Sequence, residues 1–417
     1  MENIHGDNLA LFQNHEVHVG SQKTEWLIYR PINQLTEGAA IEFNVPGTST
    51  SYIDLANTLL HVNFNIVKAN GEVLEVNEKV GVTNNILHSM FSQIDLHMQQ
   101  HPTSEVGNNY AYKAYLDTLL GTPTKHDLDC IGFIKDDNDW PDDTDPSGRN
   151  TGLYMRSFWT VQSKTVDVIG HLQVDMCQQD RLLLNGAPVN VKLWQSKDTF
   201  RLAAAPDTEA YKLVIRDAAL KVAMVKVDPE LIIGQAKTLK NSEALYPYTR
   251  SVVKTFAVPS GQYSFITDDL FQGEVPRQLI VGLVSSSAIH GKYTKNPFNF
   301  QHFNCNYVGF FVDGQSTPSS PLQPNYKSDT YVDAFKRLYS DRIQRVTHLT
   351  RRDFKTGSCL YVFKPEGDLN DRSSQRAHTR LELKFSEGLP ETCTVIVYAN
   401  FPALLKIDAS RNVMLES

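Results

Sequence analysis

Histidine pairs are the residues of this chain whose spacing could bind a catalytic metal ion. Metal-dependent β-barrel enzymes of the cupin type use a His-x-His pair and a later Glu as ligands. None of the 13 histidines has another histidine two residues away, and the shortest spacings are His15 with His18 and His97 with His101. Neither pair has the expected Glu, so we expect no metal ion and no other cofactor in a centre of this kind.

The stretch KDDNDWPDDTDPSGRN at residues 135–150 is the most acidic part of the chain. Its six aspartates, all within residues 136–145, could bind calcium if several carboxylates converged. An EF-hand loop aligned on Asp143 places Gly148 at the required turn, but Tyr154 falls where the bidentate Glu belongs. The spacing excludes an EF-hand and favours a solvated, variable surface loop, with an adventitious cation site as the alternative.

A basic run lies between Lys336 and Lys355, where seven basic residues accompany only two acids, Asp341 and Asp353. Such a run could contact the phosphates of nucleic acid or an acidic neighbour. Salt bridges between subunits or a plain solvated face explain it at least as well. The residues that we consider for a basic inner surface are Arg337, Arg342, Arg345, Arg351 and Arg352.

The local motifs of common enzyme classes are missing from the sequence. There is no GxxxxGK[ST] phosphate loop, no HExxH pair and no GxSxG elbow, and none of the five cysteines lies in a recognisable nucleophile context. A glycosidase pair would leave no local signature among 47 acidic residues, so that class stays open. We predict that the protein is not an enzyme and has no catalytic residue and no small-molecule substrate.

Charge, cysteine content and hydropathy narrow the class of protein further. The formal net charge of −7 argues against coating by nucleic acid through a general positive field. Five cysteines without a CxxC pair indicate reduced thiols and assembly in the cytosol or nucleus. No basic segment with an apolar core begins the chain, and no long apolar run follows. We therefore expect neither a signal peptide nor a membrane span.

Strict alternation of apolar and polar residues runs through the chain and is typical of half-buried strands. It predicts strands at 60–66, 94–98, 172–176, 189–193 and 381–385, separated by Gly, Pro, Asn and Asp turns. Helical spacing occurs only in short stretches, at 109–121, 228–241 and 331–339. Such a pattern indicates an antiparallel all-β sandwich or barrel with a few short helices.

One motif appears twice, as FNVPGTSTSYI at residues 43–53 and FAVPSGQYSFI at residues 256–266, 213 residues apart. Four further pairs of segments follow in the same order with similar offsets. They are 60–64 with 279–283, 94–98 with 308–312, the stretch around Tyr115 with that around Phe335, and 172–176 with 381–385. The order and the near-constant offset predict two copies of one strand-rich domain.

A length of 417 residues suits two cores better than one, since single cores stop growing near ~250–300 residues. An eight-stranded jelly roll needs about 200 residues once its loops are included, whereas an immunoglobulin-like sandwich is about half that size. We predict an all-β double jelly-roll of two eight-stranded antiparallel sandwiches. Its parts would be an N-terminal arm at 1–24, a first jelly-roll domain at 25–207 and a second at 208–417.

Several long strings resemble the major capsid protein of Polinton (Maverick) elements and the related adintoviruses, which are virus-like DNA elements. The strings are SYIDLANTLLHVNFNI, SKTVDVIGHLQVDM, QDRLLLNGAPVNVKL, YTKNPFNFQHFNCNYVGFFVDGQSTPSSPLQPNY and RLELKFSEGLPETCTVIVYANF. The resemblance covers the chain from about residue 25 to the end. It is weakest in the first twenty residues and at 136–150.

This resemblance implies a structural major capsid protein with a double jelly-roll fold. Three copies would form a homotrimer, a hexon-like pseudo-hexameric capsomer, and many capsomers would tile an icosahedral shell around double-stranded DNA. The implied partners are further copies of the chain, minor or penton capsid proteins and, indirectly, the packaged DNA. The implied location is the virion, assembled in the host nucleus or cytoplasm.

Aromatic and proline-rich loops are our predicted trimer contacts, because interfaces between subunits are rich in aromatic side chains. The candidates are Tyr293, Phe298, Phe300, Phe303, Pro318, Pro321, Pro324 and Tyr326. An aromatic strand of the subunit's own core would look the same in sequence.

Three alternatives to a major capsid protein stay open. A penton or minor capsid protein usually has one jelly roll, and this chain indicates two. A carbohydrate-binding or adhesion module on a β-sandwich predicts exposed Trp or Tyr platforms. A hydrolase or monooxygenase on two jelly rolls requires a concave pocket with converging carboxylates or histidines.

Overall fold

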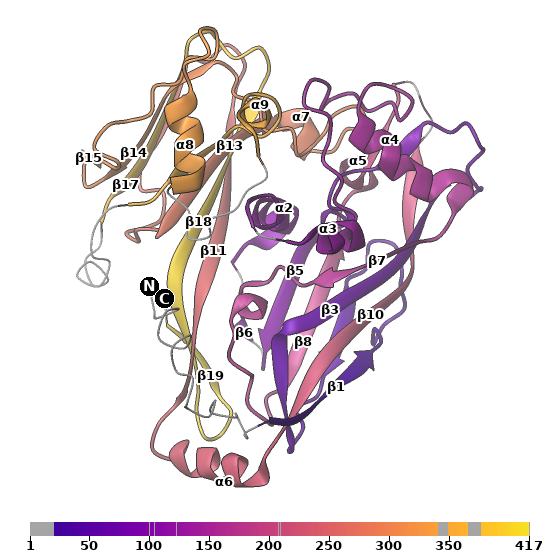
Figure 1. The fold of residues 1–417 in the computed structure, drawn as a ribbon, viewed down its shortest axis with the longest axis vertical. Helices are drawn as coiled ribbons and strands as arrows, with labels where there is room; N and C mark the ends of the chain where they lie inside the picture. The colour runs from indigo at the N-terminus through magenta and orange to yellow at the C-terminus, as the bar shows by residue number, and fades with distance from the viewer. Residues whose placement is uncertain are drawn as a thin grey trace, which may run out of the picture.

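The computed structural model describes residues 21–416 except 100, 104, 122, 207, 209, 341–348 and 366–376. Antiparallel strands are the predominant regular structure of the described chain, accompanied by short helices (Figure 1). This confirms the predicted all-β class with a few short helices. No helix among the described residues has the length and hydropathy that a membrane crossing needs.

The first half of the molecule contains two four-stranded sheets and a small strand pair. The sheets have the orders β1-β10-β3-β7 and β2-β8-β5-β6, and β4 pairs with β9. The bounds are β1 Ser21–Tyr29, β2 Ile41–Val45, β3 Ser51–Lys68, β4 Val80–Val82, β5 Phe91–Met98, β6 His101–Pro102, β7 Val166–His171, β8 Val189–Gln195, β9 Leu202–Ala204 and β10 Tyr211–Val227.

The second half contains a five-stranded and a four-stranded sheet. Their orders are β11-β18-β13-β16, with β19 added beside β18, and β12-β17-β14-β15. The bounds are β11 Ala244–Val258, β12 Ser264–Thr267, β13 Gln278–Ser285, β14 Cys305–Val312, β15 Gln315–Ser316, β16 Leu360–Phe363, β17 Thr379–Phe385, β18 Cys393–Ile407 and β19 Val413–Glu416.

Both halves follow one strand order once β4, β9 and β19 are set aside. In each half the first strand of the chain pairs with the eighth, the eighth with the third and the third with the sixth. The other sheet of each half joins the second, seventh, fourth and fifth strands in that order. A shared order of this length supports the predicted duplication independently of residue identities.

Strand β10 corrects the predicted division of the chain after residue 207. It begins at Tyr211, yet it pairs along its length with β3, from Tyr211 opposite Lys68 to Lys226 opposite Ser51, and with β1 on its other edge. A division at 207 would therefore remove a central strand from the first half. The helix α6 (Pro229–Thr238) follows β10 and leads into β11 at the lower end of the molecule (Figure 1).

Of the five pairs of similar segments found in the sequence, three lie in equivalent elements of the two halves and two do not. The pairs β3 with β13, β5 with β14, and α2 with α8 hold the same place in both halves. The motif at 43–53 spans β2 and the start of β3, whereas its echo spans β11 and β12, one strand earlier in the order. Both copies encode a strand that ends before a proline and turns into the next strand, so the likeness reflects a shared turn.

The predicted strand at 172–176 is wrong, although the other four predicted strands lie within β3, β5, β8 and β17. Strand β7 ends at His171, and a 3-10 helix, η4, begins at Asp175. Leu172, Val174 and Met176 are all buried. The alternation of apolar and polar residues here therefore indicates burial and not pairing with a neighbouring strand. In place of a strand partner, the Gln173 N–H donates to the Tyr110 hydroxyl at 3.3 Å.

The helices lie in the connections between strands. The three predicted stretches form α2, α6 and α8, and α6 begins as expected, with Asp228 accepting from the Glu230 N–H at 2.8 Å. The sequence did not predict the others. The bounds are α1 Ile86–Ser89, α2 Tyr110–Leu120, α3 Lys125–Ile131, α4 Thr151–Ser157, α5 Asp198–Arg201, α7 Ser286–Ile289, α8 Val332–Ser340, α9 Arg351–Lys355, η2 Gly107–Asn109, η3 Phe158–Ser163 and η4 Asp175–Gln178.

One continuous apolar core fills both halves. In the first half the alternating residues Val189, Val191 and Leu193 of β8 are buried. In the second half Phe310 of β14 and Phe363 of β16 bring rings from the two sheets to a centroid distance of 6.1 Å. Helices α2 and α3 lie between the halves (Figure 1).

Candidate functional site

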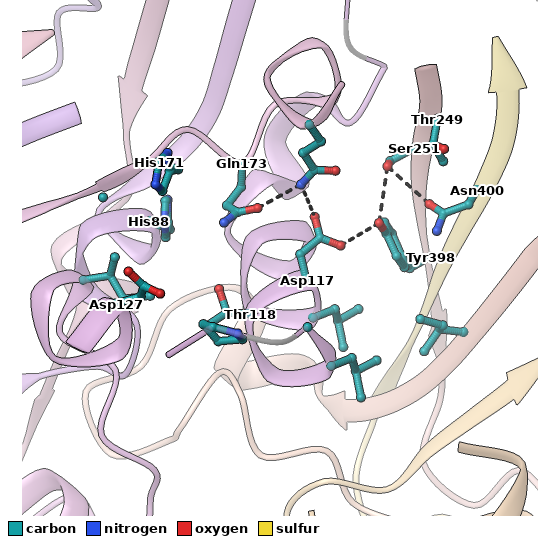
Figure 2. A pocket seen from close by; sticks show the side chains of 18 of the residues that line it. His88, Asp117, Thr118, Asp127, His171, Gln173, Thr249, Ser251, Tyr398 and Asn400 are labelled. Atoms are coloured by element: carbon teal, nitrogen blue, oxygen red, sulfur yellow. Dashed lines mark hydrogen bonds between the residues drawn. The ribbon is translucent and has the colours of Figure 1, made fainter. Parts of the chain in front are cut away.

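A cavity of about 650 Å³ lies where the two halves meet, and we call it the junction cavity. Its first-half lining comes mainly from α2, α3, β7 and the segment after β7, with single residues of β3 and α1, and its second-half lining comes from β11, β13 and β18. Polar side chains of both halves form one continuous hydrogen-bonded row, from Gln173 through Gln178 and Asp117 to Tyr398, Ser251 and Asn400 (Figure 2).

Lys113 on α2 is the charged centre of this junction. Its ammonium group is 2.7 Å from Asp117 Oδ2, one helical turn further along α2, and 3.3 Å from Asp175 Oδ1. It also donates to the Gln173 carbonyl at 3.0 Å. The side chains of Lys113 and Asp175 are 1% and 0% exposed, so these two charges compensate one another away from bulk water.

Hydrogen bonds connect this charged cluster to the second half. The Tyr398 hydroxyl on β18 donates to Asp117 Oδ1 at 2.7 Å, and the Ser251 N–H on β11 donates to Asp175 Oδ2 at 2.9 Å. We call Lys113, Asp117, Asp175, Ser251 and Tyr398 the junction cluster. It joins α2 and η4 of the first half to the two neighbouring strands β11 and β18 of the second.

Burial controls the ionisation of this cluster. Desolvation alone would lower the pKa of Lys113, but the carboxylates of Asp117 and Asp175 reverse this and hold its pKa well above the usual value. Burial raises the pKa of Asp175, and the Lys113 charge and the Ser251 hydrogen bonds only partly offset that rise. The lysine therefore stays charged and is a fixed part of the interior.

His88 lies beside the junction cluster and lines the same cavity. It is fully buried, and its Nδ1 is 2.9 Å from the Tyr110 hydroxyl. Desolvation, together with the nearby Lys113 charge, lowers the pKa of His88 to about 3. The imidazole is therefore neutral at physiological pH.

The arrangement supports cross-linking of the halves and offers no nucleophile with its base. Ser251 Oγ lies 3.3 Å from both the Tyr398 hydroxyl and Asn400 Oδ1, and no histidine contacts it among the hydrogen bonds of the described chain. Within the described ranges, no group of three or more His, Cys, Asp and Glu side chains could hold a metal ion. The residues in place position the two halves of the chain relative to each other.

The acidic stretch at 136–145 makes the second connection between the halves, which corrects its interpretation as a solvated loop. The Asn296 amide of the second half donates to Asp136 Oδ2 and to the Pro141 carbonyl, both at 2.9 Å. The Asn296 N–H and the Gln301 amide donate to the two oxygens of Asp142, each at 3.3 Å. Desolvation raises the pKa of Asp142, against the lowering effect of Asn296 and Lys295.

Ion pairs extend this connection toward the solvent. Arg352 on α9 pairs with Asp139, and Lys135 pairs with the buried Asp353. We call residues 135–145 with Asn296, Gln301, Arg352 and Asp353 the acidic-loop clasp. Asp136, Asp139 and Asp142 bond side chains of the second half, so this part of the stretch forms a contact within the chain and not an exposed variable surface.

Half of the predicted trimer-contact residues belong to the subunit's own interior. Phe298, Phe300, Pro324 and Tyr326 are buried, so they cannot offer a surface to another subunit. Phe298 stacks on Tyr115 of α2 with ring centroids 4.2 Å apart. The aromatic signal at 298–300 therefore marks the contact between the halves of one chain.

The other predicted contact residues lie nearer the surface. Tyr293, Phe303, Pro318 and Pro321 are half-buried, and the Tyr293 hydroxyl donates to the Tyr211 carbonyl at 2.9 Å. Their role in contacts between subunits stays a prediction.

The predicted basic surface is largely neutralised where the structure describes it. Arg337 on α8 is 3.7 Å from Asp333, and Arg352 pairs with Asp139. The Arg351 guanidinium lies over the Tyr331 ring at 5.0 Å and donates to the Asp329 carbonyl at 2.8 Å. Arg342 and Arg345 lie outside the described residues. The use of this face toward DNA stays a prediction.

Sequence reasoning missed the junction cluster, although one signal for it was present. Lys113 and Asp117 stand four residues apart in a helical stretch whose other residues are mostly apolar or aromatic. An ion pair at this spacing in a helix without a polar face indicates burial. Nothing in the sequence indicated Asp175, Ser251 or Tyr398 as partners, because they are far from α2 in the chain.

Comparison with known proteins gives a fold and one relative. No family model matches the chain. A protein of Caenorhabditis elegans described as uncharacterized is 25% identical, over 95% of this chain and 98% of its own length.

Three solved structures share the fold over nearly the whole chain. A Sputnik virophage chain has a TM-score of 0.58 at 12% identity, covering 100% of this chain and 93% of its own length. The mavirus major capsid protein has a TM-score of 0.54 at 10% identity, covering 99% of this chain and 93% of its own length. A chain of the PBCV-1 virus capsid has a TM-score of 0.59 at 10% identity, covering 97% of this chain and 99% of its own length. The fold of this protein is therefore that of viral major capsid proteins.

Proposed function

We propose that the protein is a structural major capsid protein without catalytic activity. The observation that carries the proposal is the fold, which matches viral capsid chains over nearly their whole length and nearly the whole of this chain. The polar centre at the junction supports the same function, because its groups bond one another across the halves. Function would then depend on the sides of the molecule, as in assemblies built by symmetry.

We infer further that each half is an eight-stranded jelly roll, which makes the chain a double jelly-roll. The shared pairing order of the two halves supports this. The boundary that suits the pairing lies after β10, within 228–243, and not after residue 207. Two similar units in one chain allow a trimer to occupy a sixfold environment, as the resemblance to Polinton and adintovirus capsid proteins implies.

Self-association into trimers, and of trimers into an icosahedral shell around double-stranded DNA, is the assembly that we propose. Minor or penton capsid proteins would be the other partners, and the virion would be the location. The half-buried Tyr293, Phe303, Pro318 and Pro321 remain the proposed contacts. Obligate interfaces of this kind usually bury ~2,000 Å² or more, so a stable trimer is expected in solution.

The test is the oligomeric state of the purified full-length chain, measured by light scattering and followed by electron microscopy. We expect homotrimers at micromolar concentration, and pseudo-hexameric capsomers or shells as concentration rises. A chain that stays monomeric at high concentration would overturn the proposal. A pentamer would instead favour a penton protein.

A further inference from the structure

A groove of about 770 Å³ lies above the acidic-loop clasp, and we call it the tryptophan groove. It is lined by residues 138–143 and Arg149 of the first half and by parts of 299–304, 355–357 and 387–390 of the second. The two halves therefore build it jointly, and it exists only while the clasp holds the loop against the second half. It is separate from the junction cavity, with which it shares no lining residue.

Trp140 gives the groove an aromatic surface that is already fixed in position. The Arg149 guanidinium lies over the indole at 4.2 Å from the ring centroid, while the Arg149 N–H donates to Asp143 at 2.7 Å. Trp140 nevertheless remains 45% exposed and lines the groove. An exposed indole that its neighbours hold in place can stack against a flat apolar face of a ligand without losing much side-chain freedom.

One buried acceptor of the groove lining lacks a hydrogen-bond partner among the described residues. Asn299 is 4% exposed, and its Oδ1 accepts no hydrogen bond from any described residue. The same side chain hydrogen-bonds Asp142, so the amide orientation is fixed. A buried acceptor that lines a groove and lacks a partner calls for a donor from a ligand or from water.

His302 adds a donor of defined orientation. Its Nδ1 accepts the Asn304 N–H at 2.9 Å, and its ring stacks on Tyr326 with centroids 4.1 Å apart. Burial, helped by the Lys355 charge, lowers the pKa of His302 to about 4, so the ring is neutral at physiological pH. The proton of the neutral ring is therefore on Nε2, which can donate to a ligand oxygen.

The charges that line the groove disfavour an anionic ligand. Four lining residues are acids and two are cations: Asp139, Asp142, Asp143 and Glu387 against Arg149 and Lys355. Three of these charges are paired outside the lining, Asp139 with Arg352, Glu387 with Lys327 and Lys355 with Asp329, which leaves two carboxyl groups against Arg149. Phosphates and sialic acids would meet an excess of negative charge, whereas neutral hydroxyl groups can donate to carboxylates.

We propose that the tryptophan groove binds a neutral saccharide, with a pyranose ring stacked on Trp140 and its hydroxyl groups bonded to Asn299, His302 and the groove carboxylates. A sugar ring has a flat face of C–H groups and a rim of hydroxyls that both donate and accept. That combination matches an aromatic platform beside an orphan acceptor, a neutral donor and carboxylates. The inference does not depend on capsid assembly.

The test is binding of the full-length protein to an array of immobilised glycans with neutral and sialylated members, followed by titration of a soluble neutral hit. We expect binding to neutral glycans, weaker binding to their sialylated counterparts, and a change in Trp140 fluorescence on titration. Trp140→Ala should weaken binding by about tenfold or more and remove the fluorescence change, tenfold being about 1.4 kcal/mol.

Trp26→Ala is the matched control, because Trp26 on β1 is 51% exposed and lies outside the groove lining. It should leave the affinity unchanged. Absence of any neutral hit, preference for sialylated or phosphorylated glycans, or equal loss in both variants would each overturn the inference. Trimers that form but bind no sugar would remove this inference alone.

Discussion

The two connections between the halves differ in how far water reaches their charges. In the junction cluster the side chains of Lys113 and Asp175 are 1% and 0% exposed. In the acidic-loop clasp the outer pair, Arg352 and Asp139, is 64% and 48% exposed. Both are ion pairs between oppositely charged groups at short range, so they differ in solvent exposure and not in chemistry.

Solvent exposure decides how much each connection can contribute to the stability of the fold. A charge that is buried with its partner destabilises the fold strongly when the partner is removed, because nothing else can solvate it. An exposed pair loses little, because water replaces the missing partner and salt already screens the attraction. The junction cluster should therefore fix how the halves sit, while the outer clasp mainly shapes the surface above it.

Replacing Lys113 with methionine should have the largest effect. Met has a similar length and fits an apolar site, but the change leaves the buried Asp175 and the partly buried Asp117 without their cation. We expect the free energy of unfolding to fall by about 3–5 kcal/mol, measured by denaturant titration. The exposed Lys237→Met on α6 is the control and should change it little.

A second substitution separates lost charge compensation from lost packing. Adding Asp175→Asn to Lys113→Met removes one of the stranded carboxylates, so part of the stability should return. If the double variant is less stable than the single variant, packing around Lys113 matters more than its charge, and the contrast between the two connections fails.

His88 should make the junction sensitive to pH. Its folded pKa of about 3 lies below the usual unfolded value near 6.5, so the native state excludes a proton that the unfolded chain accepts. The contribution of His88 to stability is therefore complete above pH 6.5 and is lost as pH falls toward 3.

His88→Gln removes this titration while keeping a group that can accept from Tyr110. Between pH 7 and pH 5, the free energy of unfolding of the wild type should fall by about 2 kcal/mol more than that of the variant. Denaturant titrations at the two pH values measure the difference, with the exposed His126→Gln as control. Parallel pH profiles for wild type and His88→Gln would contradict a buried neutral imidazole.

The sequence was informative wherever burial alone decides structure. The alternation in 60–66, 94–98, 189–193 and 381–385 predicted strands because one side of each faces a core. The same signal failed at 172–176, where Leu172, Val174 and Met176 are buried without a neighbouring strand. The alternation of apolar and polar residues shows that one side of a segment is buried. Whether the segment pairs with another strand depends on distant parts of the chain, which a local pattern cannot show.

Contacts between distant segments account for the other errors. Asp136 and Asp142 looked solvated because their donors, Asn296 and Gln301, lie more than 150 residues away. Phe298 and Phe300 looked like contacts between subunits because the sequence does not show whether an aromatic side chain is buried by its own subunit or by another one. The predicted domain boundary at 207 is wrong because β10 pairs with β3. The distance between the repeated segments could not reveal this pairing.

Arg352→Ala should have the smallest effect and gives the sharpest check of the contrast. The guanidinium is exposed and pairs with an exposed carboxylate, so water can solvate Asp139 once the partner is gone. We expect no measurable change in the free energy of unfolding, either at low salt or at high salt. The buried Asn296 holds the root of the same loop, so the loop should keep its place. A loss comparable to that of Lys113→Met would mean that the exposed pair stabilises the fold as much as the buried cluster does, and the contrast between the two connections would fail.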